Sequence, residues 1–197
     1  AFAAIRPPGH HAERETPMGF CLFGNIAIGA KHALDHHGLK RVAVVDFDVH
    51  HGNGTQDLLQ DDPRVLFISS HEMPLYPGTG DPSDTGEHDN VINIALKAGT
   101  RSKEFREIYE AQVFPRLRAF KPDLILVSAG FDAHRADPLA NICLETADFA
   151  WVTGRICDIA DQVCEGRVVS ALEGGYDLEA LADSAAAHVK TLQERAA

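Results

Sequence analysis

The stretch VDFDVHHGNG, residues 45–54, carries two carboxylates and two imidazoles within six consecutive residues. It continues the apolar run RVAVV, and charged groups beside a buried strand are costly unless they are paired or bound to a metal ion. Side chains of an extended segment alternate between two faces, so Asp46, Asp48 and His50 project to the same side. Such a mixed set of ligands suits zinc, and also ferrous iron, cobalt or manganese. The spacing therefore predicts a metal site at the end of this strand.

A catalytic zinc ion is held by three protein ligands and keeps a fourth position open for water or substrate. Asp48 and His50 would supply two of these ligands. The loop GFDAHRADP, residues 130–138, offers candidates for the third, which are Asp132, His134 and Asp137. The residue types alone leave this choice open.

Two further polar segments have the groups that a reaction beside such an ion needs. RPPGHHA places His10 and His11 after a rigid turn, and paired imidazoles can take a proton from water and return it to a leaving group. LEGGYD has two glycines before Tyr176, whose phenol can donate a hydrogen bond to a developing oxyanion. Metal ion, base and oxyanion donor together predict metal-assisted hydrolysis of an amide. The chain has no G-x-S-x-G motif, which argues against a serine hydrolase.

The elements that must position these residues alternate along the chain. Short strands rich in Val, Ile and Leu are predicted at residues 41–47, 64–69, 90–96, 123–129 and 167–173. Helices are predicted at residues 24–37, 102–119 with a kink at Pro115, 146–163 with Thr146 as N-cap, and 178–193. This alternation predicts an α/β fold with a parallel sheet and helices on both faces. Right-handed crossovers then bring the polar segments to one edge, beyond the carboxyl ends of the strands.

The overall composition limits the classes of protein to consider. The length of 197 residues and the 45% of hydrophobic residues predict a single domain over residues 1–197. Its net charge of −11 argues against direct nucleic-acid binding but is compatible with a basic substrate. The four cysteines show no metal or disulfide spacing and predict buried thiols in a reducing, cytoplasmic compartment. No apolar run reaches the roughly 20 residues of a membrane span.

The motifs RPPGHHA, DFDVHHGNGTQ, SAGFDAHRADP and LEGGYD, in this order, resemble those of the zinc-dependent histone deacetylase and acetylpolyamine amidohydrolase superfamily. The forms HHGNG and SAGFDA are most similar to its class II-like and bacterial members. The resemblance runs from about Ile5 to Leu192. It implies a three-layer arginase/deacetylase-like α/β fold, with a central mainly parallel sheet, that removes acyl groups from lysine-like amines.

The resemblance also implies a role for each matching residue. The implied zinc ligands are Asp48, His50 and Asp137. His11 is implied as general base and acid, His10 as its electrostatic partner, Asp46 as the carboxylate that orients His10, and Tyr176 as the oxyanion donor. A potassium ion, often present in the family, would be held by Asp46, Asp48, His50, Ser69 and Ser70. The narrow substrate tunnel would be formed by Gly19, Phe20 and Tyr76, with Leu144 at its rim.

The sequence departs from the family pattern in three places. Asn53 stands where many relatives have Asp behind the second histidine, and an amide cannot hold an imidazole as a carboxylate does. Tyr76 replaces a frequent Phe and gives the tunnel a polar edge. The family normally has a substantial segment before RPPGHH, so we expect a chain that lacks the N-terminal part of the domain; its end after EGGYD is also early.

Three hypotheses of function remain open at the level of the sequence. The leading one is a zinc-dependent deacetylase acting on an acetyl-lysine protein or peptide, or on an acetylpolyamine. The second is an arginase-like hydrolase with two manganese ions, which the tandem histidines and EGGYD disfavour. The third is an inactive acyl-lysine-binding fragment. The absence of a long insertion favours a monomer.

Overall fold

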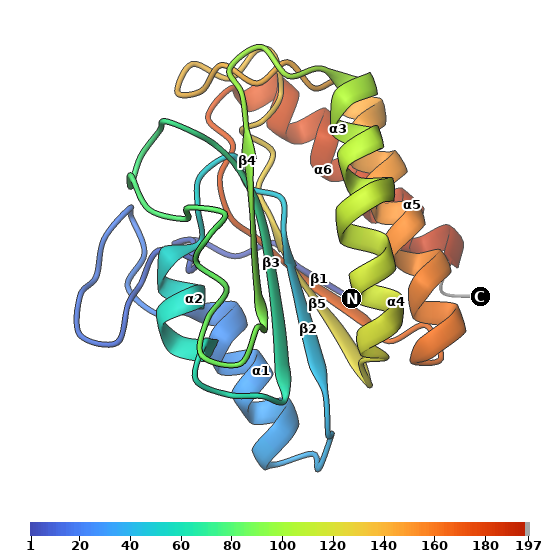
Figure 1. Ribbon diagram of the computed structural model, residues 1–197. Coiled ribbons are helices and arrows are strands. Elements are labelled where there is room, and N and C mark those ends of the chain that lie inside the picture. The colour runs from blue at the N-terminus through green and yellow to red at the C-terminus, as the bar shows by residue number, and fades with distance from the viewer. Residues whose placement is uncertain (196–197) are drawn as a thin grey trace.

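A parallel six-stranded sheet forms the centre of the computed structural model, which describes residues 1–195 (Figure 1). The strand order is β1-β6-β5-β2-β3-β4, and every neighbouring pair is parallel. The strands are β1 (Phe2–Ala3), β2 (Val42–Asp46), β3 (Val65–Glu72), β4 (Val91–Leu96), β5 (Leu124–Ala129) and β6 (Val168–Leu172). All strands after β1 were predicted from the sequence, whereas the two residues of β1 were too few to give a pattern.

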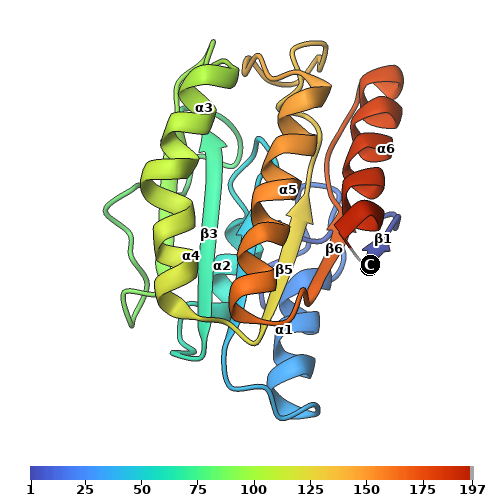
Figure 2. The same ribbon diagram turned by 90° about the vertical axis from the view of Figure 1, so that its right-hand side faces the viewer.

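Helices cover both faces of this sheet. They are α1 (Asn25–Asp35), α2 (Asn53–Leu59), α3 (Ser102–Ile108), α4 (Phe114–Phe120), α5 (Thr146–Val163) and α6 (Leu178–Arg195). Helices α1 and α2 lie on one face, and the others lie on the opposite face, where Figure 2 shows α5 beside α6. The predicted three-layer α/β architecture is confirmed. Within residues 1–195, no helix has both the length and the apolar character needed to cross a membrane.

Strand β2 shows why the strand sequences are apolar throughout. All five of its residues are buried, and alternate side chains enter two different cores. Ala43 and Val45 pack in the core beneath α3, α4 and α5, whereas Val42 and Val44 pack in the core beneath α1. A strand covered on both faces cannot alternate apolar with polar residues, so its polar groups appear only where the strand ends.

The segment 102–119, predicted as one kinked helix, is divided into three pieces. A π-helical turn, Tyr109–Val113, separates α3 from α4, and Pro115 stands in the first turn of α4. Proline has no N–H to donate to the preceding turn, and the wider turn accommodates this loss. The Tyr109 hydroxyl reaches the Ser70 hydroxyl of β3 at 2.6 Å.

The N-terminus of α5 differs from the prediction at one residue. Thr146 is the first helical residue rather than the cap, which is Glu145. The Glu145 N–H donates to the carboxylate of Asp148 at 2.9 Å. The Thr146 hydroxyl lies 3.4 Å from that of Ser184 on α6, so it joins two helices instead of capping one.

Candidate active site and metal centre

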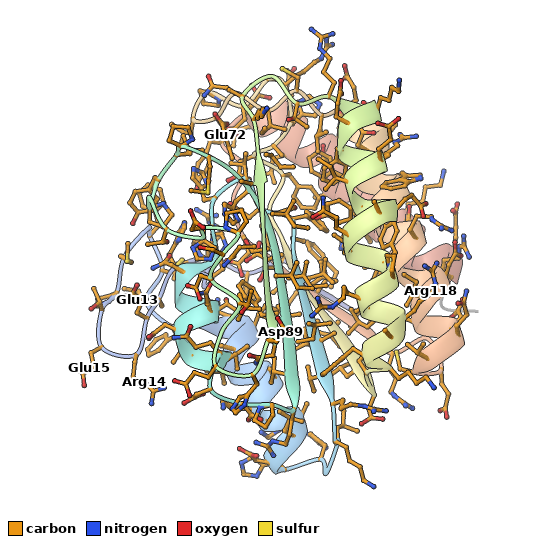
Figure 3. The ribbon with its side chains drawn as sticks, in the orientation of Figure 1. Glu13, Arg14, Glu15, Glu72, Asp89 and Arg118 are labelled. Carbon is orange, nitrogen blue, oxygen red and sulfur yellow. The ribbon has the colours of Figure 1, made fainter. Side chains whose placement is uncertain are left out.

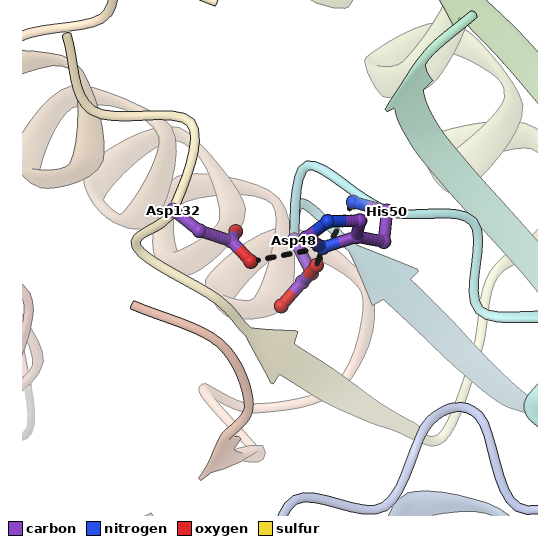
Figure 4. A group of neighbouring side chains, drawn as sticks. All are labelled: Asp48, His50 and Asp132. Carbon is purple, nitrogen blue, oxygen red and sulfur yellow. Dashed lines mark hydrogen bonds and ion pairs between the residues drawn. The ribbon is translucent and has the colours of Figure 1, made fainter. Parts of the chain in front are cut away.

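A buried cluster of two carboxylates and one imidazole lies at the carboxyl ends of β2 and β5 (Figure 4). The Nδ1 atom of His50 is 3.0 Å from Oδ1 of Asp48 and 3.1 Å from Oδ2 of Asp132. One ligand atom from each residue lies within 4.8 Å of the other two. Asp48 and His50 follow β2, and Asp132 follows β5, the neighbouring strand. The sheet therefore brings the two loops together, as the sequence predicted.

Asp132, and not Asp137, completes this cluster, so the structure does not bring the predicted third ligand together with Asp48 and His50. The oxygens of Asp137 are occupied by main-chain groups: Oδ1 accepts from the Leu139 N–H at 2.9 Å, and Oδ2 accepts from the Tyr176 N–H at 2.8 Å. Asp132 comes three residues after the end of β5 and points back to His50. Asp137 instead holds the main chain of Tyr176.

The cluster has the geometry and charge that a zinc ion needs. A tetrahedral ion with bonds of about 2.0 Å separates its ligand atoms by about 3.3 Å, close to the two distances around His50. Burial and, to a lesser extent, the nearby Asp48 raise the pKa of Asp132 to about 7. Burial lowers the pKa of His50, but Asp132 and Asp48 outweigh it and raise that pKa to about 10. The two carboxylates thus favour a cation between them.

The outer oxygens of both carboxylates are fixed by the main chain. Oδ2 of Asp48 accepts from the Gly174 N–H at 2.8 Å, and Oδ1 of Asp132 accepts from the Val49 N–H at 2.9 Å. A Cβ atom at Gly174 would lie 2.1 Å from Oδ2 of Asp132, and one at Gly130 would lie 2.1 Å from Oδ2 of Asp48. Both glycines are therefore required by the close approach of the backbone to the carboxylates. Partners of this kind orient the ligands of metal sites.

The tandem histidines are buried beside the cluster in two different surroundings. His10 contacts two carboxylates, with Nδ1 3.0 Å from Oδ2 of Asp46 and Nε2 3.6 Å from Oδ1 of Asp48. Burial alone would lower the pKa of His10, but Asp48 and Asp46 raise it well above its usual value. His11 faces the amide of Asn53, at 2.7 Å from Nδ1 to Oδ1. Burial lowers its pKa to about 3, and His10 contributes to that shift. His10 is therefore cationic and His11 neutral.

A cavity of about 420 Å³ reaches His50 of the cluster and His11. Its lining residues are His11, Gly19, Phe20, His50, Leu75, Tyr76, Leu139 and Tyr176. Gly19, Phe20 and Tyr76 thus lie where the sequence predicted a tunnel. Burial raises the pKa of the Tyr176 phenol, and Asp48 adds to this, so the phenol keeps its proton as a hydrogen-bond donor.

Leu144 does not lie at the rim of this cavity, so that prediction is wrong. It is 1% exposed and packs in the core, and its main chain bonds to those of Ala133 and Arg135. Leu139, five residues earlier, is 48% exposed and lines the cavity instead.

Comparisons with known proteins identify the family of this chain. Residues 1–192 match the model of the histone deacetylase domain. The chain belongs to the histone deacetylase family. It is 50% identical over 194 residues to histone deacetylase 14, chloroplastic, of Arabidopsis thaliana, covering 97% of this chain and 46% of that protein. It is 44% identical over 182 residues to a probable deacetylase of Archaeoglobus fulgidus, covering 91% of this chain and 50% of that protein.

The crystal structure of the HDA15 HD domain superposes with a TM-score of 0.92 at 39% identity. The match covers 98% of this chain and 55% of that one. The arginase/deacetylase-like fold is confirmed by this likeness. The chain spans about half the length of the curated relatives it matches.

Ser69 and Ser70, predicted to help to hold potassium, lie on β3 beside β2. Ser69 pairs in register with Asp46, and its hydroxyl lies 3.0 Å from Nδ1 of His71. The hydroxyl of Ser70 is engaged by Tyr109. A potassium ion held by these residues together with Asp46, Asp48 and His50 stays a prediction.

One residue of this deacetylase-family site was missed entirely in the sequence. Glu173 is buried, and its Oε2 accepts from the N–H groups of Gly9 and His10 at 2.6 and 3.1 Å. Burial raises the pKa of its carboxyl to about 7, although His10 opposes the shift. Its position directly after the apolar strand β6 was the signal, since a carboxylate there must find buried donors.

Proposed function

We propose that this chain carries the catalytic centre of a zinc-dependent amide hydrolase that removes acetyl groups from lysine side chains. One observation carries the proposal: His50, which belongs to the cluster with Asp48 and Asp132, lines a cavity that His11 and Tyr176 also line. A metal ligand (His50), the base (His11) and the oxyanion donor (Tyr176) thus line the same cavity. Family membership supports deacetylation as the reaction.

Each of these side chains would have its own role in hydrolysis. Asp48, His50 and Asp132 would hold the zinc ion, which when bound would polarise the substrate carbonyl and make water a stronger nucleophile. His11, neutral because it is buried, can accept the proton of the attacking water and return it to the departing amine. The Tyr176 phenol can donate to the carbonyl oxygen as negative charge develops there.

The cavity and the charge of the chain favour a lysine-like substrate. Phe20 and Tyr76 are 67% and 47% exposed, and they offer aromatic walls to an aliphatic stem. A net charge of −11 attracts the basic peptides and amines that carry acetylated lysine. An acetylpolyamine has the same acylated aliphatic amine, so it is the alternative substrate.

The test is hydrolysis of an acetyl-lysine fluorogenic peptide by the zinc-loaded chain, with a chelated sample and N-acetylspermidine as parallel arms. We expect activity that is lost on chelation, restored by zinc and abolished in Asp132→Asn. The control is Asp183→Asn, which changes an exposed carboxylate of α6. Hydrolysis of N-acetylspermidine alone would assign the polyamine substrate. A folded, zinc-loaded chain inactive on both would refute the proposal.

A further inference from the structure

Asn53 lies between the imidazole of His11 and an acidic side chain, that of Glu13. Its Oδ1 is 2.7 Å from Nδ1 of His11, and its Nδ2 donates to Oε1 of Glu13 at 2.7 Å. Asn53 is 6% exposed, so the bond to His11 is shielded from water. A carboxylate therefore stands one amide away from the histidine, and the departure from Asp at position 53 does not remove acidic support from this site.

The direction of each hydrogen bond follows from Glu13. A carboxylate can only accept hydrogen bonds, so the end of the Asn53 amide that faces it must be the NH₂ group. The second neighbour of that NH₂ group, the Met18 sulfur at 3.3 Å, is also an acceptor. The oxygen of the amide must then face His11, and Nδ1 of His11 must carry the proton. This leaves Nε2 of His11 unprotonated.

Without the contact to Glu13, the Asn53 amide would not determine which nitrogen of His11 carries the proton. Rotation of the amide by 180° would present NH₂ to His11 and would favour the tautomer that is protonated at Nε2. That tautomer has no free lone pair with which to accept a proton through Nε2. The carboxylate of Glu13 disfavours the rotated amide because two acceptors would then face each other at 2.7 Å.

Backbone contacts around Asn53 fix the positions of His11, Glu13 and Asn53 relative to one another. The N–H groups of Gly54 and Thr55, in the first turn of α2, donate to the carbonyl of His10 at 2.9 and 3.1 Å. A Cβ atom at Gly54 would lie 2.3 Å from the carbonyl oxygen of Ala12, so α2 packs directly on the loop that carries the histidines. The Glu13 N–H donates to the carbonyl of Thr16 at 3.0 Å and closes a turn there.

We propose that Glu13 is a positioning residue for the His11 base: acting through the Asn53 amide, it fixes the tautomer in which Nδ1 is protonated and Nε2 is free. The inference rests on the proposed function for its consequence in catalysis. The tautomer itself is a property of the folded chain and can be measured without turnover.

The test exchanges the amide and the carboxylate between the two positions. Asn53→Asp alone sets two carboxylates against each other, and Glu13→Gln alone allows the Asn53 amide to rotate. In the double variant, the new carboxylate at position 53 accepts from His11, and the new amide at position 13 donates to that carboxylate. We expect each single variant to lower kcat by on the order of 10-fold or more with KM little changed, and the double variant to recover to within about 3-fold of the parent.

The matched control is Glu15→Gln, which alters an exposed glutamate of the same loop. Figure 3 shows Glu15 at the outer edge of this loop, two residues from Glu13. We expect this variant to keep the parent's kcat and tautomer. A double variant no more active than the poorer single variant would overturn the proposal.

Nitrogen-15 NMR of the imidazole of His11 gives a readout that needs no activity. We expect the parent chain to show a protonated Nδ1 and an unprotonated Nε2, and Glu13→Gln to shift toward a mixture of tautomers. A protonated Nε2 in the parent, or an unchanged tautomer in Glu13→Gln, would overturn the proposal. If the parent is inactive but shows the expected tautomer shift, the proposed function fails and the role of Glu13 stands.

Discussion

Gly174 offers a direct test of the metal centre because the space its side chain would fill is already occupied. A Cβ atom there would lie 2.1 Å from Oδ2 of Asp132 and 2.6 Å from Oδ2 of Asp48. Ordinary contacts begin at about 3.4 Å, so Gly174→Ala must displace the Asp132 carboxylate by about 1.3 Å. Its backbone is outside the positive-φ region, so alanine is allowed there and the effect is steric.

A displacement of this size exceeds what a ligand set can absorb, since productive geometry must be held within about 0.5 Å. We expect Gly174→Ala to weaken zinc binding by on the order of 10²-fold, comparable to the larger effects of removing orienting partners. The assay is competition with a zinc-binding dye at neutral pH, with circular dichroism to confirm folding.

Gly154 supplies the matched control for that substitution. It lies inside α5, and the nearest heavy atom to a Cβ there is 3.7 Å away, an ordinary contact. Gly154→Ala should leave zinc affinity unchanged and raise the free energy of unfolding by about 0.5–1 kcal/mol, because alanine favours the helix interior over glycine. Zinc affinity in Gly174→Ala equal to that of the parent would show that Asp132 is not held as described and would refute the assignment of the third ligand.

Three further predictions test other parts of the site and the fold. Tyr176→Phe should keep zinc but lower kcat by on the order of 10²-fold, the loss of an oxyanion donor; unchanged turnover of the acetyl-lysine peptide would remove Tyr176 from the mechanism. Asp132→Asn should lose zinc, whereas Asp137→Asn should keep it and lower kcat, since Asp137 holds the Tyr176 main chain; metal analysis with the reverse pattern would restore Asp137 as ligand. Burial lowers the pKa of His188 to about 4, so the unfolded chain binds more protons between pH 4 and 6.5, and His188 costs stability as pH falls through that range. The free energy of unfolding in urea should drop by about 2 kcal/mol more for the parent than for His188→Gln between pH 7 and pH 5, and equal drops would contradict the buried neutral state.

The sequence was sufficient for those features that follow from periodicity. Asp48 and His50 alternate along one extended segment at the end of a buried strand, so their convergence could be predicted. The choice between Asp132 and Asp137 could not, because both stand in a loop without a repeating pattern. Two successive turns decide it: the His134 N–H donates to the Phe131 carbonyl at 3.2 Å, and the Asp137 N–H donates to the His134 carbonyl at 2.9 Å.

The same limit explains the errors outside the metal centre. Leu144 and Leu139 are both apolar residues of one loop, and only the main-chain pairing of Leu144 with Ala133 shows which of them enters the core. The sequence shows that Pro115 lacks an N–H donor, so an irregularity in the helix before it could be expected. That this irregularity is a π-helical turn depends on packing and could not be predicted. Sequence patterns thus predicted the elements, and tertiary contacts selected among neighbouring residues.

The tandem histidines show how the fold gives two adjacent and identical side chains different chemistry. His10 faces carboxylates on both ring nitrogens, so a proton stays on it; His11 meets only the neutral amide of Asn53, and the charge of His10 opposes a second proton nearby. In many active sites, the surroundings of two neighbouring titratable groups shift their pKa values in opposite directions. One group then serves an electrostatic role and the other transfers protons. An amide at position 53 keeps His11 neutral more strongly than a carboxylate in direct contact would. The difference in protonation between the two histidines therefore follows from their different partners, carboxylates for His10 and an amide for His11.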